Sequence, residues 1–137
     1  MSKSSFVRYF TFFIAGALIY SLIEIAWRSY THWTMGVTGG LCMSALYYIN
    51  KHCKSIPVAS RALIGCAVIT LAEFLVGIAV NFVCKWNVWD YSSLPFNFMG
   101  QICLLYSTIW YFLCFPAFFI CEWVERSFFE NPRKKRV

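Results

Sequence analysis

Glu73 stands out because it lies inside a long apolar run, where a charged side chain has no evident solvent. It follows Arg61 by twelve residues, roughly 18 Å along a helix that rises about 1.5 Å per residue. If the run spans a membrane, that depth is near the middle of the bilayer. An ionised carboxylate there costs several kcal/mol unless it is paired or hydrated. Glu73 therefore indicates either an ion- or proton-linked site or a neutral carboxyl that holds helices together.

Glu24 and Arg28 form a second pair of charged candidates, near the end of the first apolar run. They are four residues apart, so on a helix they lie on one face within reach of an ion pair. One interpretation is that they set the electric field around Glu73. The other is an interfacial salt bridge that only fixes the depth of the helix.

Small and polar residues recur every three or four positions through the run that contains Glu73. This seam comprises Cys66, Thr70, Glu73, Gly77 and Asn81. The opposite face is apolar and suits lipid, so the seam suits the interior of a helix bundle.

Further polar side chains follow in the stretch from Trp86 to Cys103. Together with the seam and the first charged pair, they predict a polar, outward-facing pocket for a small molecule or an ion. Its expected lining is Glu24, Arg28, Glu73, Asn81, Asp90, Asn97 and Gln101. Four aromatic residues could form a roof over it or a simple interfacial belt: Trp86, Trp89, Tyr91 and Phe96.

The elements that must position these side chains are apolar segments of membrane-spanning length. Of 137 residues, 60% are hydrophobic and 13% are charged, against roughly 25% charged in a soluble domain. The sequence predicts an all-α membrane protein, a single domain over residues 1–137 with four transmembrane helices, because a span needs about 20 apolar residues. The expected spans are 8–27, 33–50, 61–84 and 100–123.

The second of these spans carries small residues at four-residue spacing, Gly36, Gly40 and Ser44. Such a pattern lets a second helix backbone approach closely. We therefore expect these residues, and Gly77 in the seam, to mediate helix packing.

Basic residues indicate how the chain is oriented. Ten of the twelve Lys and Arg residues lie in the N-terminal segment, the 51–61 connection and the C-terminal tail. Positive charge favours the cytoplasmic side, so both termini are expected there and the Trp86–Asn97 loop outside. The net charge of +6 then predicts contact with anionic membrane lipids rather than nucleic acid, with the basic run 133–136 as a headgroup anchor.

Motifs for several chemistries are absent from the sequence. There is no Gly-x-x-x-x-Gly-Lys-Ser/Thr loop, no His-Glu-x-x-His and no Gly-x-Ser-x-Gly. His32 and His52 fall on opposite sides of the membrane in this topology, and the seven cysteines contain no Cys-x-x-Cys pair, so they are interpreted as free thiols. We expect no metal and no cofactor, and an enzyme is the less favoured class.

The aromatic stretch also carries a family resemblance, through Trp86-Asn87-Val88-Trp89-Asp90-Tyr91-Ser92, Pro95-Phe96-Asn97 and Gly100-Gln101-Ile102-Cys103-Leu104. Upstream, Glu24, Trp27-Arg28, His32 to Met35, Gly39 to Cys42 and the seam extend it over nearly the whole chain. These residues resemble the small bacterial membrane proteins described as putative ABC-transporter type IV. The resemblance implies a bacterial, multi-span membrane protein with a permease-like role. It carries over no substrate and no set of catalytic residues.

Taken together, these patterns predict a transporter-like or small-ligand-binding subunit of the bacterial inner membrane. A chain this small is expected to assemble with itself or with other membrane subunits. One alternative is a membrane enzyme acting on a lipid or lipid-linked substrate, with carboxylates as acid and base. Another is an assembly subunit without a ligand, in which the seam only joins helices.

Overall fold

The structure is a computed structural model that describes residues 3–130. Four α-helices make up most of it, and two of them continue as short π-helices. In chain order the elements are α1 (Lys3–Arg28), α2 (Trp33–His52), α3 (Val58–Gly77), η1 (Ile78–Val83), β1 (Asn97–Phe98), β2 (Ile102–Cys103), α4 (Leu104–Val124) and η2 (Glu125–Phe129). The basic run expected at 133–136 lies outside the described residues.

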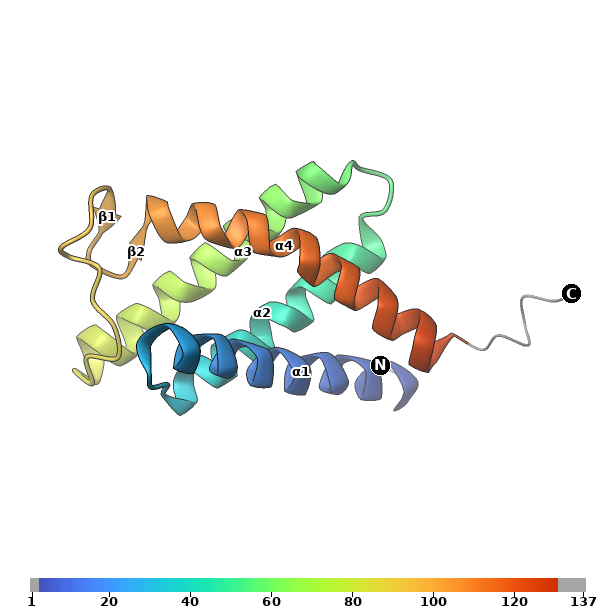
Figure 1. Cartoon of the computed structure of the whole chain (residues 1–137), viewed down its shortest axis with the longest axis horizontal. Coiled ribbons are helices and arrows are strands. Elements are labelled where there is room, and N and C mark those ends of the chain that lie inside the picture. The colour runs from blue at the N-terminus through green and yellow to red at the C-terminus, as the bar shows by residue number, and fades with distance from the viewer. Residues whose placement is uncertain (1–2, 131–137) are drawn as a thin grey trace, which may run out of the picture.

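Successive helices run in alternating directions through the bundle (Figure 1). The start of α1, the α2–α3 connection and the end of α4 lie toward one end of the molecule, which we call the termini end. The α1–α2 turn and the long loop from η1 to α4 lie at the opposite end, which we call the loop end.

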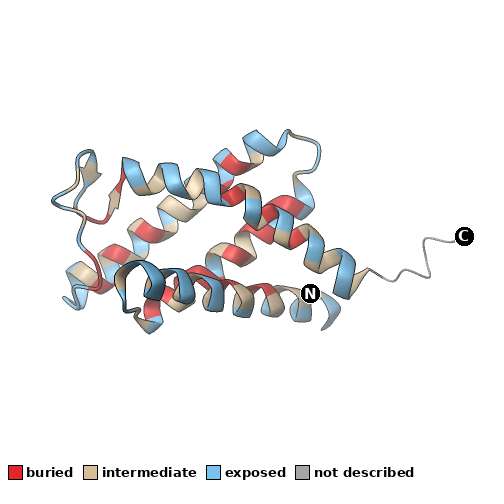
Figure 2. Ribbon diagram, viewed as in Figure 1, coloured by how far each residue is buried: buried red, intermediate tan, exposed pale blue. Residues whose placement is uncertain are grey.

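Helix α2 is the centre of the packing. It contributes to all three clusters of buried apolar side chains: Leu46 and Ile49 to one, Met43 and Tyr47 to the next, and Met35 to the third. Helix α1, by contrast, buries only Phe12 and Gly16 among its residues, and Figure 2 shows its outer face exposed. Half of the twenty residues of this central helix are buried.

Three helices are long and apolar enough to cross a membrane: Lys3–Arg28, Val58–Val83 and Leu104–Phe129. Helix α2 is absent from this set of candidate spans, although it is a continuous helix over the second expected span. Three of its polar residues, Thr34, Thr38 and Asn50, are buried, and its Gly39 and Gly40 face α1. The sequence thus predicts four helices correctly, while apolarity identifies only three of them as spans.

Helix α1 and helix α2 cross in close contact through glycines. A Cβ on Gly40 would lie 2.8 Å from the Phe13 carbonyl oxygen, and one on Gly16 would lie 2.6 Å from the Gly39 carbonyl oxygen. Ser44 Oγ lies 3.5 Å from the Tyr9 carbonyl oxygen. Gly36 faces Ser21 with more room. Gly77 packs against Gln101 and Trp89, which belong to the loop rather than to another helix.

The fourth expected span begins too early in the sequence-based prediction. Residues 97–103 form a β-hairpin, and α4 starts only at Leu104. Met99 and Gly100 both have positive φ, 55° and 70°. The backbone N–H of Gln101 donates to the Phe98 carbonyl at 3.1 Å. This is the geometry of a tight hairpin turn that favours glycine, so Gly100 and Gln101 cannot start a helix.

Candidate functional site

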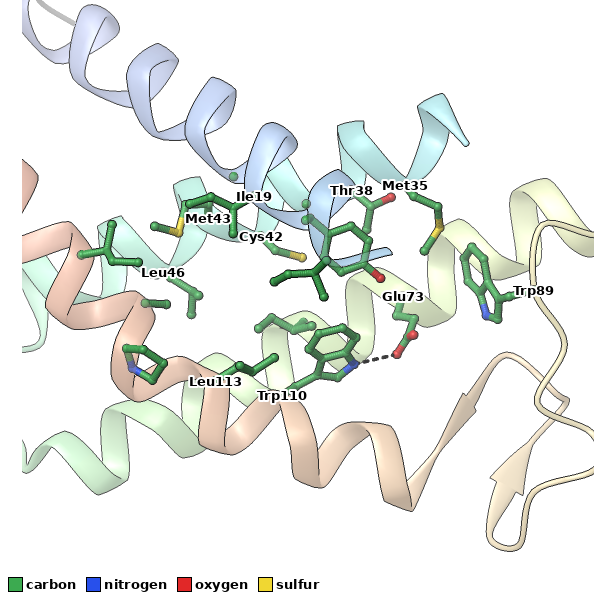
Figure 3. A pocket seen from close by; sticks show the side chains of 18 residues that line it. Ile19, Met35, Thr38, Cys42, Met43, Leu46, Glu73, Trp89, Trp110 and Leu113 are labelled. Atoms are coloured by element: carbon green, nitrogen blue, oxygen red, sulfur yellow. Dashed lines mark hydrogen bonds between the residues drawn. The ribbon is translucent and has the colours of Figure 1, made fainter. Parts of the chain in front are cut away.

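A cavity of about 250 Å³ lies among the four helices, toward the loop end. Helices α1, α2 and α4 supply most of its wall, α3 supplies Ile69 and Glu73, and the loop supplies Trp89 (Figure 3). Most of these side chains are apolar, and Pro116 and Ala117 of α4 are among them. The wall is therefore a hydrocarbon-like surface with one carboxylate set into it.

Both carboxylate oxygens of Glu73 accept hydrogen bonds. The Tyr91 hydroxyl donates to Oε1 at 2.8 Å, and the Trp110 indole N–H donates to Oε2 at 3.2 Å. Glu73 is 4% exposed. Neither donor carries a charge, so these bonds orient the carboxylate without neutralising it.

Aromatic rings surround this carboxylate on several sides. Tyr20 of α1 and Trp110 of α4 lie with ring centroids 5.8 Å apart, and Tyr91 stacks on Tyr106 at 4.7 Å. Burial raises the pKa of the Tyr91 hydroxyl, and the adjacent Glu73 raises it further. Tyr91 therefore remains a hydrogen-bond donor at ordinary pH.

Asn81 and Gln101, both predicted to line a polar pocket, instead bond to each other and to the loop. The Asn81 amide donates to Gln101 Oε1 at 2.7 Å, and Asn81 Oδ1 accepts from the Val88 N–H at 2.7 Å. The Gln101 carbonyl accepts from the Trp89 indole at 2.9 Å. The π-helix η1 carries Asn81 into this position. The network anchors the loop on α3 and leaves neither side chain on the cavity wall.

Glu24 and Arg28 form the ion pair that their spacing suggests, with Nε and Oε2 2.7 Å apart. Arg28 also donates to the Val88 carbonyl at 3.3 Å, and its guanidinium lies over the Tyr30 ring. The pair thus connects the end of α1 to the loop. Neither residue is among those that line the cavity.

Asp90 and Asn97 organise the loop backbone. Asp90 accepts hydrogen bonds from the Ser92 amide and hydroxyl, and these bonds lower the pKa of the Asp90 carboxyl. Asn97 donates to the carbonyl of Leu94 at 2.8 Å and accepts from the Gly100 N–H at 3.1 Å. Asp90 is exposed to solvent, and neither residue lines the cavity.

The four aromatic residues expected as a roof divide into two groups. Trp89 is 4% exposed, lines the cavity and bonds to Gln101, and Tyr91 bonds to Glu73. Trp86 instead packs against Trp33 at the surface, and Phe96 is 81% exposed. Of the seven polar residues expected in the pocket, Glu73 alone lines this apolar cavity.

A second polar cluster, at the termini end, has no counterpart in the sequence-based prediction. Arg8 pairs with Glu125 at 2.5 Å, and Glu125 accepts from the Tyr47 hydroxyl at 3.0 Å. Asn50 links Arg61 to Glu122 through bonds of 2.9 and 3.1 Å. We call these residues the termini-end cluster. Its members come from distant parts of the chain, so the only signal in the sequence was the concentration of basic residues near the helix ends.

Three apolar helices of spanning length, with a buried carboxylate among their side chains, define the class as a helical membrane protein. The profile of the family described as Putative ABC-transporter type IV matches residues 11–136. The chain therefore belongs to this family, as its sequence resemblance predicted, and it is a membrane protein of transporter-like type.

Searches of curated proteins and of solved structures returned no match.

Proposed function

We propose that the chain is a ligand-binding subunit of a transporter in the bacterial inner membrane, with Glu73 as its ion- or proton-linked carboxylate. The observation that carries this proposal is a carboxylate that is 4% exposed on the wall of a 250 Å³ apolar cavity. A carboxyl that only joined helices would need no cavity beside it. Intramembrane acids in transporters commonly mark the path of a substrate or an ion, and membership in the family supports the same function.

In this proposal the chain crosses the membrane four times, with both ends in the cytoplasm. Because α1 and α3 both run from the termini end to the loop end and α4 runs back (Figure 1), α2 must return the chain from the loop end to the termini end. Its lower apolarity fits this role, since ten of its residues are buried against protein. The basic residues near the termini end favour the cytoplasmic side.

Proton linkage at Glu73 would depend on the titratable groups whose charges reach it. These are Tyr20 and Glu24 of α1, Cys42 of α2 and Tyr91 of the loop. None of the four is cationic in any protonation state. Within the cavity, the negative charge of Glu73 can therefore be neutralised by protonation or balanced by a bound cation.

A single bundle of this size offers one cavity wall open to its surroundings rather than a closed pathway. We propose that copies of the chain, or other membrane subunits, complete the path, with lipids around the assembly. Energy would come from an ion gradient or from a separate ATPase subunit.

Flux through proteoliposomes tests this function even while the substrate is unidentified. The vesicles are loaded with a mixture of small organic amines, acids and neutral solutes, a pH gradient is imposed, and efflux is followed by mass spectrometry. We expect at least one solute to leave faster than from protein-free vesicles, and Glu73→Gln to abolish the difference. Glu122→Gln, at the opposite end of the bundle, serves as the matched control and should retain the flux.

Three results would overturn the proposal. Unchanged flux in Glu73→Gln would remove the carboxylate from the mechanism. Efflux that never exceeds that of protein-free vesicles, together with loss of assembly in Gly40→Leu but not in Glu73→Gln, would identify an assembly subunit. Chemical turnover of a lipid in detergent without a gradient would instead indicate an enzyme.

A further inference from the structure

The cavity joins an extended apolar volume to a single negative charge. Glu73 is the sole residue with a formal charge among those that line it in the described part of the chain. The nearby guanidinium of Arg28 is held by Glu24 at 2.7 Å and lies off the wall. No protein cation on the wall therefore competes for the Glu73 carboxylate.

The hydrogen bonds to Glu73 also leave room for another partner. Each carboxylate oxygen can accept two hydrogen bonds, and the structure gives each one a neutral donor, Tyr91 for Oε1 and Trp110 for Oε2. These two donors fix the direction in which the remaining lone pairs point. An ammonium group at the cavity wall could approach without displacing either bond.

Aromatic rings near the carboxylate favour the same charge. Trp89, Trp110 and Tyr20 all line the cavity, and the electron-rich face of an aromatic ring attracts an organic cation. An anion would meet repulsion from Glu73 and from the negative faces of these rings. A neutral solute would gain only from the apolar wall.

The cavity volume limits the size of the occupant. An engineered cavity of roughly 150 Å³ accepts a benzene molecule. A volume of about 250 Å³ thus holds one aromatic ring with a small substituent, or an alkyl group of similar bulk.

We propose that the cavity binds an amphipathic organic cation, whose apolar body fills the space among α1, α2 and α4 and whose ammonium group pairs with Glu73. This names the substrate class of the site and rests on the proposed function of the cavity. A lipid acyl chain, which carries no charge, is the alternative occupant that the experiment must separate.

Three probes of equal non-hydrogen atom count test the assignment: benzyltrimethylammonium, neutral N,N-dimethylbenzamide and anionic 3-phenylpropanoate. Binding to the full chain in lipid nanodiscs is measured by calorimetry. We expect the cation to bind at least tenfold more tightly than the neutral probe, and the anion to bind most weakly. In Glu73→Gln the cation should lose its advantage, in Glu73→Asp it should keep part of it, and in Glu122→Gln all of it.

A second measurement locates the bound probe and does not depend on a variant that folds. Cys42 lines the cavity, whereas Cys84 lies outside it. The cation should slow alkylation of Cys42 by iodoacetamide, as followed by peptide mass spectrometry, while alkylation of Cys84 stays unchanged.

The outcomes separate the two proposals. Equal affinity for the cation and the neutral probe, with Cys42 protected by both, would overturn the cation assignment and leave a ligand-binding cavity. If none of the three probes binds or protects Cys42, the cavity is not a ligand site, and the proposed function falls with the inference.

Discussion

Tyr91 and Trp110 hold the Glu73 carboxylate from two different elements, the loop and α4. The 2.8 Å bond from the Tyr91 hydroxyl joins the loop to α3. Tyr91→Phe should lower the free energy of unfolding by about 1–3 kcal/mol, since a hydrogen bond contributes roughly 1 kcal/mol and one to a charged group up to about 3. The measurement is a denaturation titration in one fixed detergent.

A double-mutant cycle distinguishes this bond from general packing. If Tyr91 acts through Glu73, then Tyr91→Phe should cost much less in the Glu73→Gln background than in the wild type. Equal costs in both backgrounds would show that the Tyr91 hydroxyl stabilises the fold through contacts other than its bond to Glu73.

Asp90 permits a test at the surface, where pH can act directly. Its folded-state pKa lies below the ordinary value of 3.8 because Ser92 donates to the ionised form. A lowered pKa means that folding favours the carboxylate. Its contribution to stability is present above the unfolded-state pKa and is lost as pH falls through the folded-state pKa.

Ser92→Ala removes one of the two donors to Asp90, so the Asp90 pKa should move back toward its ordinary value. Carbon-detected NMR of selectively labelled aspartate follows the titration. An unchanged pKa in the variant would mean that the Ser92 backbone amide alone produces the shift.

Glu73 could be singled out from sequence because an acid in a long apolar run is costly wherever it lies. Its partners could not, since Tyr91 is 18 and Trp110 is 37 residues away along the chain. For a related reason, the sequence could not show that Asn81 and Gln101 hydrogen-bond to each other. Polar side chains in an apolar region can serve a ligand or one another, and only the three-dimensional arrangement distinguishes the two.

At the scale of elements, the close α1–α2 crossing depends on glycines, whose lack of a side chain lets the two backbones approach. A Cβ on Gly40 would meet the Phe13 carbonyl at 2.8 Å, whereas one on Gly36 would meet the Ser21 hydroxyl at 3.3 Å. Alanine normally favours a helix over glycine by about 0.5–1 kcal/mol. Gly40→Ala should nevertheless destabilise the bundle by about 1–2 kcal/mol, because overpacking costs about 1–3 kcal/mol.

Gly36→Ala is the matched control, on the same helix and one turn away. It should be neutral or slightly stabilising, since a serine side chain can move aside. Unfolding of both variants under identical conditions checks the pair; similar stabilities would contradict the close approach at Gly40.

The spacing of Gly36, Gly40 and Ser44 led to an expected close contact, and the helices do meet along α2. Gly16 and Gly39 were not singled out, although they cross backbone to backbone. A four-residue pattern on one helix identifies a face, but the partner's small residue lies on another helix with no pattern of its own. The hairpin before α4 was missed because a glycine such as Gly100 fits the small-residue pattern of a membrane helix as well as it fits a turn.

At the scale of the whole molecule, the termini-end cluster joins the first and last helices. Arg8 and Glu125 have side chains only 23% and 17% exposed. Removing one charge from a shielded pair leaves the other charge without a partner, here that of Arg8. Glu125→Gln should therefore cost about 1–3 kcal/mol of stability. Arg126→Ala, whose side chain is 65% exposed, should cost less than about 1 kcal/mol. Equal losses in a denaturation titration of the two variants would mean that shielding does not matter here.

Helix α2 decides the topology, and composition alone could not assign it. The second expected span is a helix of 20 residues, ten of which are buried against protein, so its composition reflects protein contacts as well as its surroundings. The apolarity of a sequence identifies a membrane span by its lipid-facing side chains. The buried residues of a central helix face protein instead, so their composition does not mark a span. The direction of the bundle must therefore be measured in the membrane.

Two native cysteines mark the two ends of the bundle. Cys53 follows α2 at the termini end, and exposed Cys84 follows η1 at the loop end. In a variant that keeps only these two, a membrane-impermeant maleimide added to intact cells should label Cys84, while Cys53 should react only after permeabilisation. If α2 lay along the membrane surface, α3 would cross in the opposite sense, and Cys53 would be labelled from outside while Cys84 was protected. That reversed pattern would refute the four-span topology, and with it the cytoplasmic position of the chain's C-terminal end.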